Sequence, residues 1–174
     1  HFGESSAVSA FYLKNVQGLD GNSVDPDIKG AHVHAWGAGA TIDLGDSGLN
    51  IDGDFIQTRG NRDLGHANLW TAGLNYGKVD LNKPGSFTLG VHYVRADAGA
   101  YLLGNSALDM TDQLEYGWDN GAGVKFWTAK AGVAMQKNVE LDAYYNFGAK
   151  AFDRYDDSTK DPANTWGVEL NYAF

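Results

Sequence analysis

A strict alternation in the last nine residues is the feature that most restricts how this chain can fold. Its large members are Trp166, Val168, Leu170, Tyr172 and Phe174, and the residues between them are small or polar. Because successive side chains of a β-strand point to opposite faces, the large residues share one face. Aromatic residues stand at both ends of this apolar strip, as on the membrane-crossing strands of β-barrels. The stretch predicts a strand with a lipid-facing side.

The same period of two recurs along the chain and predicts eight β-strands. We expect them at Ser6–Asn15, His32–Leu44, Leu49–Thr58, Leu69–Val79, Ser86–Arg95, Val124–Met135, Val139–Ala151 and Trp166–Phe174. Which side chains of the first strand share the apolar face is not decided, because Phe11, Tyr12 and Leu13 are consecutive. The chain has 23 Gly, 5 Trp, 9 Tyr and 8 Phe but only 3 Pro, which favours a closed all-β structure.

The connections between these strands are predicted to alternate in length. Short turns follow the second, fourth and sixth strands, and longer loops follow the first, third, fifth and seventh. The longest loop, Ala96–Gly123, contains a stretch with room for one or two helical turns, Ala107–Glu115. Outer-membrane barrels have short turns at one end and long loops at the other. The alternation favours an antiparallel transmembrane β-barrel with both chain ends on the short-turn side.

Composition narrows the classes of protein further. Zero cysteines exclude a disulfide scaffold and thiolate chemistry, and the sequence lacks the apolar run of about 18 residues that a membrane helix needs. The formal net charge of −9 argues against nucleic-acid binding. The mean hydropathy of −0.36 looks soluble, but the half-polar strands of a membrane barrel give the same value. A soluble β-sandwich stays as the alternative; it explains the residue alternation but not the segregated loop lengths.

Charged residues occupy only the polar faces of the predicted strand centres. A charge facing lipid at the membrane midplane costs roughly 2–4 kcal/mol, so this segregation is expected if the apolar faces meet lipid. The polar faces then line a pore, and the pore-lining set is Asp43, Asp52, Asp54, Lys130, Glu140, Asp142, Lys150 and Glu169. Acids outnumber lysines in this set, which predicts a modest preference for cations.

The polar faces are also rich in glycine. The glycines on these faces are Gly37, Gly39, Gly73, Gly90, Gly132, Gly148 and Gly167. Glycines fill an eight-stranded barrel poorly unless large side chains such as Tyr144 lean over them, whereas a wider watery lumen has no such packing demand. At about 22 residues per strand, a 16-stranded porin needs roughly twice this chain. We therefore expect residues 1–174 to be a single domain, either a complete small barrel or the C-terminal half of a larger porin.

Three stretches resemble a known family. The hairpin Leu74–Val91, with its Lys-Pro-Gly-Ser turn, resembles those of porins that carry an S-layer-homology domain, the OmpM type. Lys125–Gly148 and Trp166–Phe174 are similar to the last strands of those proteins, and the ending on Phe174 resembles the terminal strand of bacterial outer-membrane barrels. Family members place a wall-binding domain before a trimeric porin barrel. No wall-binding segment is present here, and the start at His1 predicts a mature form, an engineered segment or a piece of a longer chain.

The resemblance implies a function and a set of partners. The expected function is an outer-membrane porin, a water-filled channel for passive diffusion of small hydrophilic solutes. The expected partners are outer-membrane lipid or lipopolysaccharide, other copies in a homotrimer, and the barrel assembly machinery, for which the terminal strand is the signal. The alternative is a small plugged outer-membrane barrel with a structural or adhesive role.

No catalytic constellation stands out, so we expect neither an enzyme nor a cofactor. His32 and His34 share a strand face, which suits a metal site or a pair of interfacial residues. His92 lies on a polar face, where a barrel hydrolase places its base, but no serine is near it in sequence. The Asp20–Asp27 stretch loosely resembles a calcium loop without its final glutamate. Acids in Asp153–Asn164 suit either ion bridges to lipid headgroups or a solvated loop.

Overall fold

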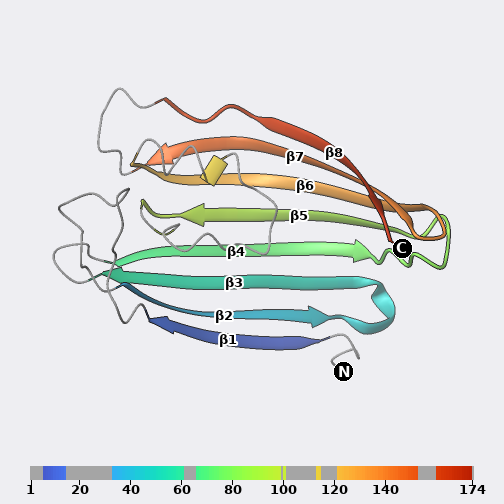
Figure 1. Ribbon diagram of the computed structural model, residues 1–174, viewed down its shortest axis with the longest axis horizontal. Coiled ribbons are helices and arrows are strands. Elements are labelled where there is room, and N and C mark those ends of the chain that lie inside the picture. Colours follow the sequence, from blue (N-terminus) through green and yellow to red (C-terminus); the bar gives the residue numbers. More distant parts are fainter. Residues whose placement is uncertain are drawn as a thin grey trace.

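The computed structural model describes residues 6–14, 33–60, 66–98, 100, 113–114, 121–152 and 160–173. They form one antiparallel sheet of eight strands that lie side by side in sequence order (Figure 1). The strands are β1 Ala7–Lys14, β2 Val33–Asp43, β3 Leu49–Gly60, β4 His66–Gly77, β5 Phe87–Ala96, β6 Gly123–Gln136, β7 Val139–Phe152 and β8 Thr165–Tyr172. The prediction of eight antiparallel strands is confirmed, with ends shifted by a few residues.

The two outer strands of the sheet are β1 and β8. Each strand pairs with its neighbours in sequence, from the β1–β2 ladder to the β7–β8 ladder. Within the described residues β1 and β8 do not pair with each other, so the sheet is not closed into a barrel. Antiparallel sheet architecture is therefore confirmed, whereas barrel closure is not seen in the described part of the chain.

The connections only partly follow the predicted alternation in length. Short turns do follow β2 and β6, and the first contains the 3₁₀ turn Gly45–Ser47. Gly48 closes this turn with a φ of 68°, a left-handed conformation that favours glycine. The exception is the connection 61–65 after β3, which is shorter than the connection 78–86 after β4. Length alone therefore does not assign the β3–β4 connection to the long-loop end.

The short-turn end is held together by hydrogen bonds between turns. The amide of Gly85 donates to the carbonyl of Ala134 at 2.7 Å, and the amide of Asn138 donates to the carbonyl of Leu81 at 3.0 Å. The amide of Ala173 donates in turn to the carbonyl of Asn138 at 2.9 Å. Strand β1 begins and β8 ends at this same end, as predicted (Figure 1).

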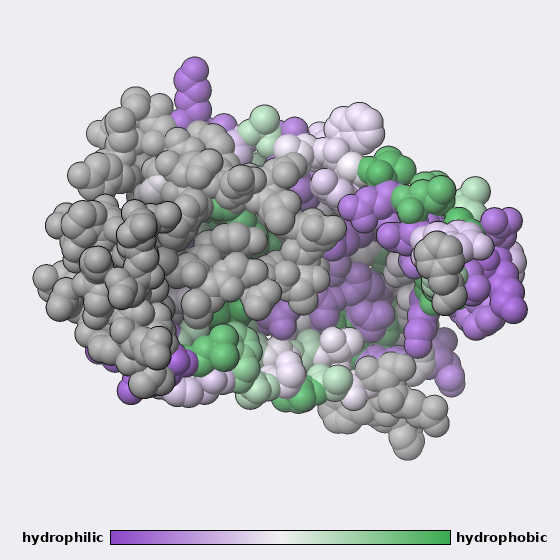
Figure 2. Space-filling model, viewed as in Figure 1, coloured by the Kyte–Doolittle hydropathy of each residue, from purple (hydrophilic) through white to green (hydrophobic). Residues whose placement is uncertain are grey.

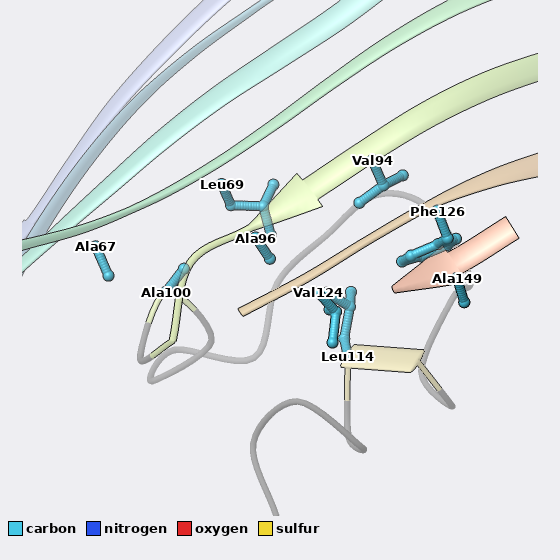
Figure 3. Packing of buried hydrophobic residues seen from close by; sticks show 9 residues of the cluster. All are labelled: Ala67, Leu69, Val94, Ala96, Ala100, Leu114, Val124, Phe126 and Ala149. Atoms are coloured by element: carbon cyan, nitrogen blue, oxygen red, sulfur yellow. The ribbon is translucent and has the colours of Figure 1, made fainter. Parts of the chain in front are cut away.

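The buried apolar cluster lies at the opposite, long-loop end. Its strand residues come from β4 to β7, and Ala100 and Leu114 join it from the long connection after β5. Figure 3 shows Leu114 beside Val124, with Phe126 on the same strand. Gln113 and Leu114 have helical backbone, in agreement with the predicted helical turn; the rest of Ala107–Glu115 lies outside the described residues. This end of the sheet therefore has a packed apolar core.

Candidate functional site

The two faces of the sheet differ sharply. Residues paired directly across strands share a face, and one such row runs Asp52, Gly73, His92, Thr128. We call the face that carries this row the inner face and its opposite the outer face. His92 is 4 % and Thr128 0 % exposed, although only one sheet is present. Inner side chains therefore cover one another, which means that the sheet curves around its inner face.

Seven of the eight residues predicted to line a pore share the inner face. They are Asp43, Asp52, Asp54, Lys130, Glu140, Asp142 and Glu169. Figure 2 shows hydrophilic side chains gathered on the visible face, between the grey atoms and the short-turn end. The alternation of side chains in the sequence thus correctly predicted that these seven residues share one face.

Lys150 is the exception, and its assignment to the inner face is wrong. The β6–β7 register shifts between Lys125 and Trp127, because two residues of β7 lie opposite one residue of β6. Gly148 lies at this bulge with a φ of 63°, a conformation that glycine adopts readily. The extra residue reverses the parity of the rest of β7. Lys150 therefore pairs with Lys125 on the outer face.

A polar network occupies the centre of the inner face. The Nε2 nitrogen of His92 donates to Asp52 Oδ1 at 3.2 Å, and Asn75 Nδ2 donates to the same oxygen. The Asn75 Nδ2 group also donates to Asn50 Oδ1 at 2.9 Å. The partner of His92 is therefore an aspartate that lies 40 residues away in sequence. Sequence reasoning placed both residues on the polar face but did not bring them together.

Glycines make these cross-strand contacts possible. Gly73 lies between Asp52 and His92 in the row, and a Cβ added to it would lie 1.8 Å from His92 Cδ2. The ring of Tyr144 lies over Gly167, which is the kind of cover that lets inner glycines line a small barrel. The inner glycines thus fill no space themselves but let larger neighbours reach across a strand.

A hollow remains on the inner face towards the short-turn end. One part, of about 270 Å³, is lined by residues of β4 to β8 that include Lys130, Asp142 and Glu169. A second part, of about 470 Å³, extends to Asp43 and Glu140, and the two parts share Asn75 and Thr88. The wall of the hollow carries four acids, Asp43, Glu140, Asp142 and Glu169, and two cations, Lys78 and Lys130.

The long-loop end of the inner face is occupied instead. Gln113 is 1 % exposed, and its Nε2 donates to Thr165 Oγ1 at 2.8 Å and to the carbonyl of Ala163 at 3.2 Å. Its Oε1 accepts from Asn146 Nδ2 at 2.9 Å. Together with Leu114, Gln113 fixes part of the long connection against the inside of β6 to β8. No pattern in the sequence pointed to this contact.

The outer face is apolar and exposed over most of its height. The Tyr93 ring lies 5.2 Å from Trp70 and 4.9 Å from Trp127, measured between centroids. On β8, Trp166 is 74 % and Leu170 68 % exposed. Val168 and Tyr172 share this face with them, as predicted, whereas Phe174 lies outside the described residues. Strand β1 follows the same division, with the Phe11 ring over Gly37 on the inner face.

The other candidate chemistry receives little geometric support. No group of three or more His, Cys, Asp or Glu is placed to hold a metal ion among the described residues. His34 lies on the outer face, 6.3 Å from the Tyr12 ring, but His32 and the Asp20–Asp27 stretch lie outside those residues. None of the helical segments described has the length and apolar character to span a membrane.

The chain matches no protein-family model and no curated protein.

Proposed function

We propose that this chain forms all or part of an outer-membrane β-barrel, a water-filled channel for passive diffusion of small hydrophilic solutes in bacteria. The observation that carries the proposal is the inverted distribution of side chains. Large apolar residues such as Trp127 and Leu89 are exposed on the outer face, whereas the inner face holds the polar network. Soluble monomers rarely expose contiguous apolar patches of this extent, and lipid is the partner that such a face fits.

The hollow on the inner face supports a channel rather than a solid core. Its wall carries four acids, Asp43, Glu140, Asp142 and Glu169, against Lys78 and Lys130. Fixed negative charge in a confined space attracts cations and repels anions. A modest cation preference is the selectivity that these residues support.

In a membrane, the backbone groups at the edges of β1 and β8 require partners, because unpaired N–H and C=O groups are costly in lipid. Pairing β1 with β8 makes a small barrel, and pairing them with further strands makes a larger one. The OmpM-type porins that the hairpins resemble imply the larger, trimeric form. The same resemblance implies that Phe174 belongs to the signal read by the barrel assembly machinery.

Planar-bilayer recording tests the proposal. The purified chain, refolded in detergent, is added to a lipid bilayer with potassium chloride on both sides. Stepwise conductance that depends on the protein supports a channel. Membrane insertion without any conductance contradicts it and favours the second candidate.

That second candidate is a plugged outer-membrane barrel with a structural or adhesive role. The packing at the long-loop end favours it, since Gln113 and Leu114 fill the inner face there. The two candidates make different predictions for Leu114→Ala. A plug that loosens gives new conductance in the variant, whereas an open channel already conducts in the unsubstituted protein.

A further inference from the structure

Every Lys and Arg on the outer face of the described strands lies at the long-loop end. We call this set the outer cationic belt: Lys14, Arg59, Arg95, Lys125 and Lys150. Within the described strands the outer face carries no Asp or Glu. The rest of that face is apolar or weakly polar towards the short turns, so the positive charge is confined to one end.

Three members of the belt are direct neighbours. Arg95 pairs with Lys125 across β5 and β6, and Lys125 pairs with Lys150 across β6 and β7. Like charges directly opposite one another on a sheet destabilise it. Among described acids, only Asp97 contacts this row, at 3.7 Å from Arg95. Among the described residues, the row therefore has an excess of positive charge that an external anion would neutralise.

The surroundings of the row identify the kind of anion. The Phe152 ring lies 4.2 Å from the Arg95 guanidinium and 5.9 Å from Lys125 Nζ. Trp70 pairs directly with Arg95, and the Tyr93–Trp127 contact lies one row nearer the short turns. Aromatic rings next to cations are typical of the level at which lipid headgroups meet acyl chains. A lipid with a negatively charged headgroup fits this surface, because the headgroup would meet the cations and the acyl chains would meet the aromatic rings.

We propose that the outer cationic belt binds the phosphate monoester of a membrane lipid headgroup on the long-loop side. The inference rests on the membrane placement proposed above. A monoester carries up to two negative charges and several acceptor oxygens, which suits three adjacent cations better than the single charge of a diester. Arg95 supplies a planar donor pair, and the two lysines supply point charges.

Lipid retention in nanodiscs tests this proposal. The full chain is placed in phosphatidylcholine discs doped with equal amounts of lipid A, which carries phosphate monoesters, and phosphatidylglycerol, a diester. After extraction into detergent, the lipids that stay with the protein are counted by mass spectrometry. We expect lipid A to be enriched over both other lipids. The variant R95Q/K125Q/K150Q should lose about a hundredfold of this enrichment, at roughly fivefold per cation.

The matched control is K78Q/K83Q/K137Q, which removes the same charge from exposed lysines near the short turns and should retain lipid A fully. Lys150→Gln alone, at an exposed position, keeps the test valid if the triple variant does not fold. Equal retention by belt and control variants overturns the inference, and so does equal enrichment of both anionic lipids. A protein that conducts but retains no lipid A overturns this inference alone. A chain that enters no disc overturns the membrane placement itself.

Discussion

His92 contacts Asp52 across an intervening strand, with Nε2 and Oδ1 3.2 Å apart. The strand between them is β4, and the residue of β4 in the same row is Gly73. A side chain at that position would separate the imidazole from the carboxylate. The central polar network of the inner face therefore depends on a residue that contributes no polar group.

Removing the carboxylate should destabilise the protein. In Asp52→Ala, the Nε2 donor of His92 and the amide of Asn75 lose their common acceptor. An unsatisfied buried donor costs about 1–3 kcal/mol, so we expect a loss of that size in the free energy of unfolding, measured by urea titration in detergent. Asp46→Ala, on an exposed turn residue, is the control and should change stability by less than about 0.5 kcal/mol. Equal losses in the two variants would contradict the role of the network.

Gly73→Ala should be destabilising because of His92 in particular. The new Cβ would lie 1.8 Å from His92 Cδ2 and 2.9 Å from Asp52 Oδ1, so the imidazole must move. Overpacking of this kind costs about 1–3 kcal/mol. In a His92→Ala background most of the clash is gone, and the double-mutant cycle should show a coupling of at least about 0.5 kcal/mol. Additive effects would mean that Gly73 is needed for another reason.

The strands were predictable because one physical rule governs all of them. Most strands have one apolar and one polar face over most of their length, so a period of two is visible where the backbone is regular. The rule fails where the backbone is irregular, and Lys150 shows this most clearly. Gly148 inserts an extra residue into β7, and every later residue of that strand changes face. A glycine inside a strand is a known sign of a bulge, but seven candidate glycines did not reveal which one held it.

Contacts between residues distant in the sequence could not be predicted, for a different reason. The Asp52–His92 pair requires the registers of two ladders at once, and periodicity fixes the face of a residue but not its partner. Gln113 and Leu114 lie in a connection without any period, so their burial against β6 to β8 left no signal in the sequence. The composition of the inner face was therefore predictable, whereas its internal contacts were not.

Lipid contact of the outer face can be measured directly. Spin labels at outward apolar positions should be quenched by a lipid-soluble reagent, and labels at inward positions should not. The outward set is Leu74, Leu89, Val133, Leu141, Val168 and Leu170. Asp142 and Lys130 are the inward controls. Equal accessibility of the two sets would rule out a membrane-embedded sheet.

Ion selectivity gives the most specific test of the inner wall. Asp142 and Glu169 are direct cross-strand neighbours, and both line the hollow beside Lys130. Under a potassium chloride gradient, the reversal potential should show a cation preference that weakens as salt rises, because screening shortens the reach of the wall charge. D142N/E169Q should reduce the preference and Lys130→Gln should increase it, since the two changes shift the wall charge in opposite directions.

The control variant D46N/D80N changes two exposed turn acids and alters the net charge as much as D142N/E169Q does. It should leave the reversal potential nearly unchanged. An equal shift for D46N/D80N and D142N/E169Q would show that net charge, rather than the inner wall, sets selectivity. An anion preference in the unsubstituted protein would refute the wall assignment.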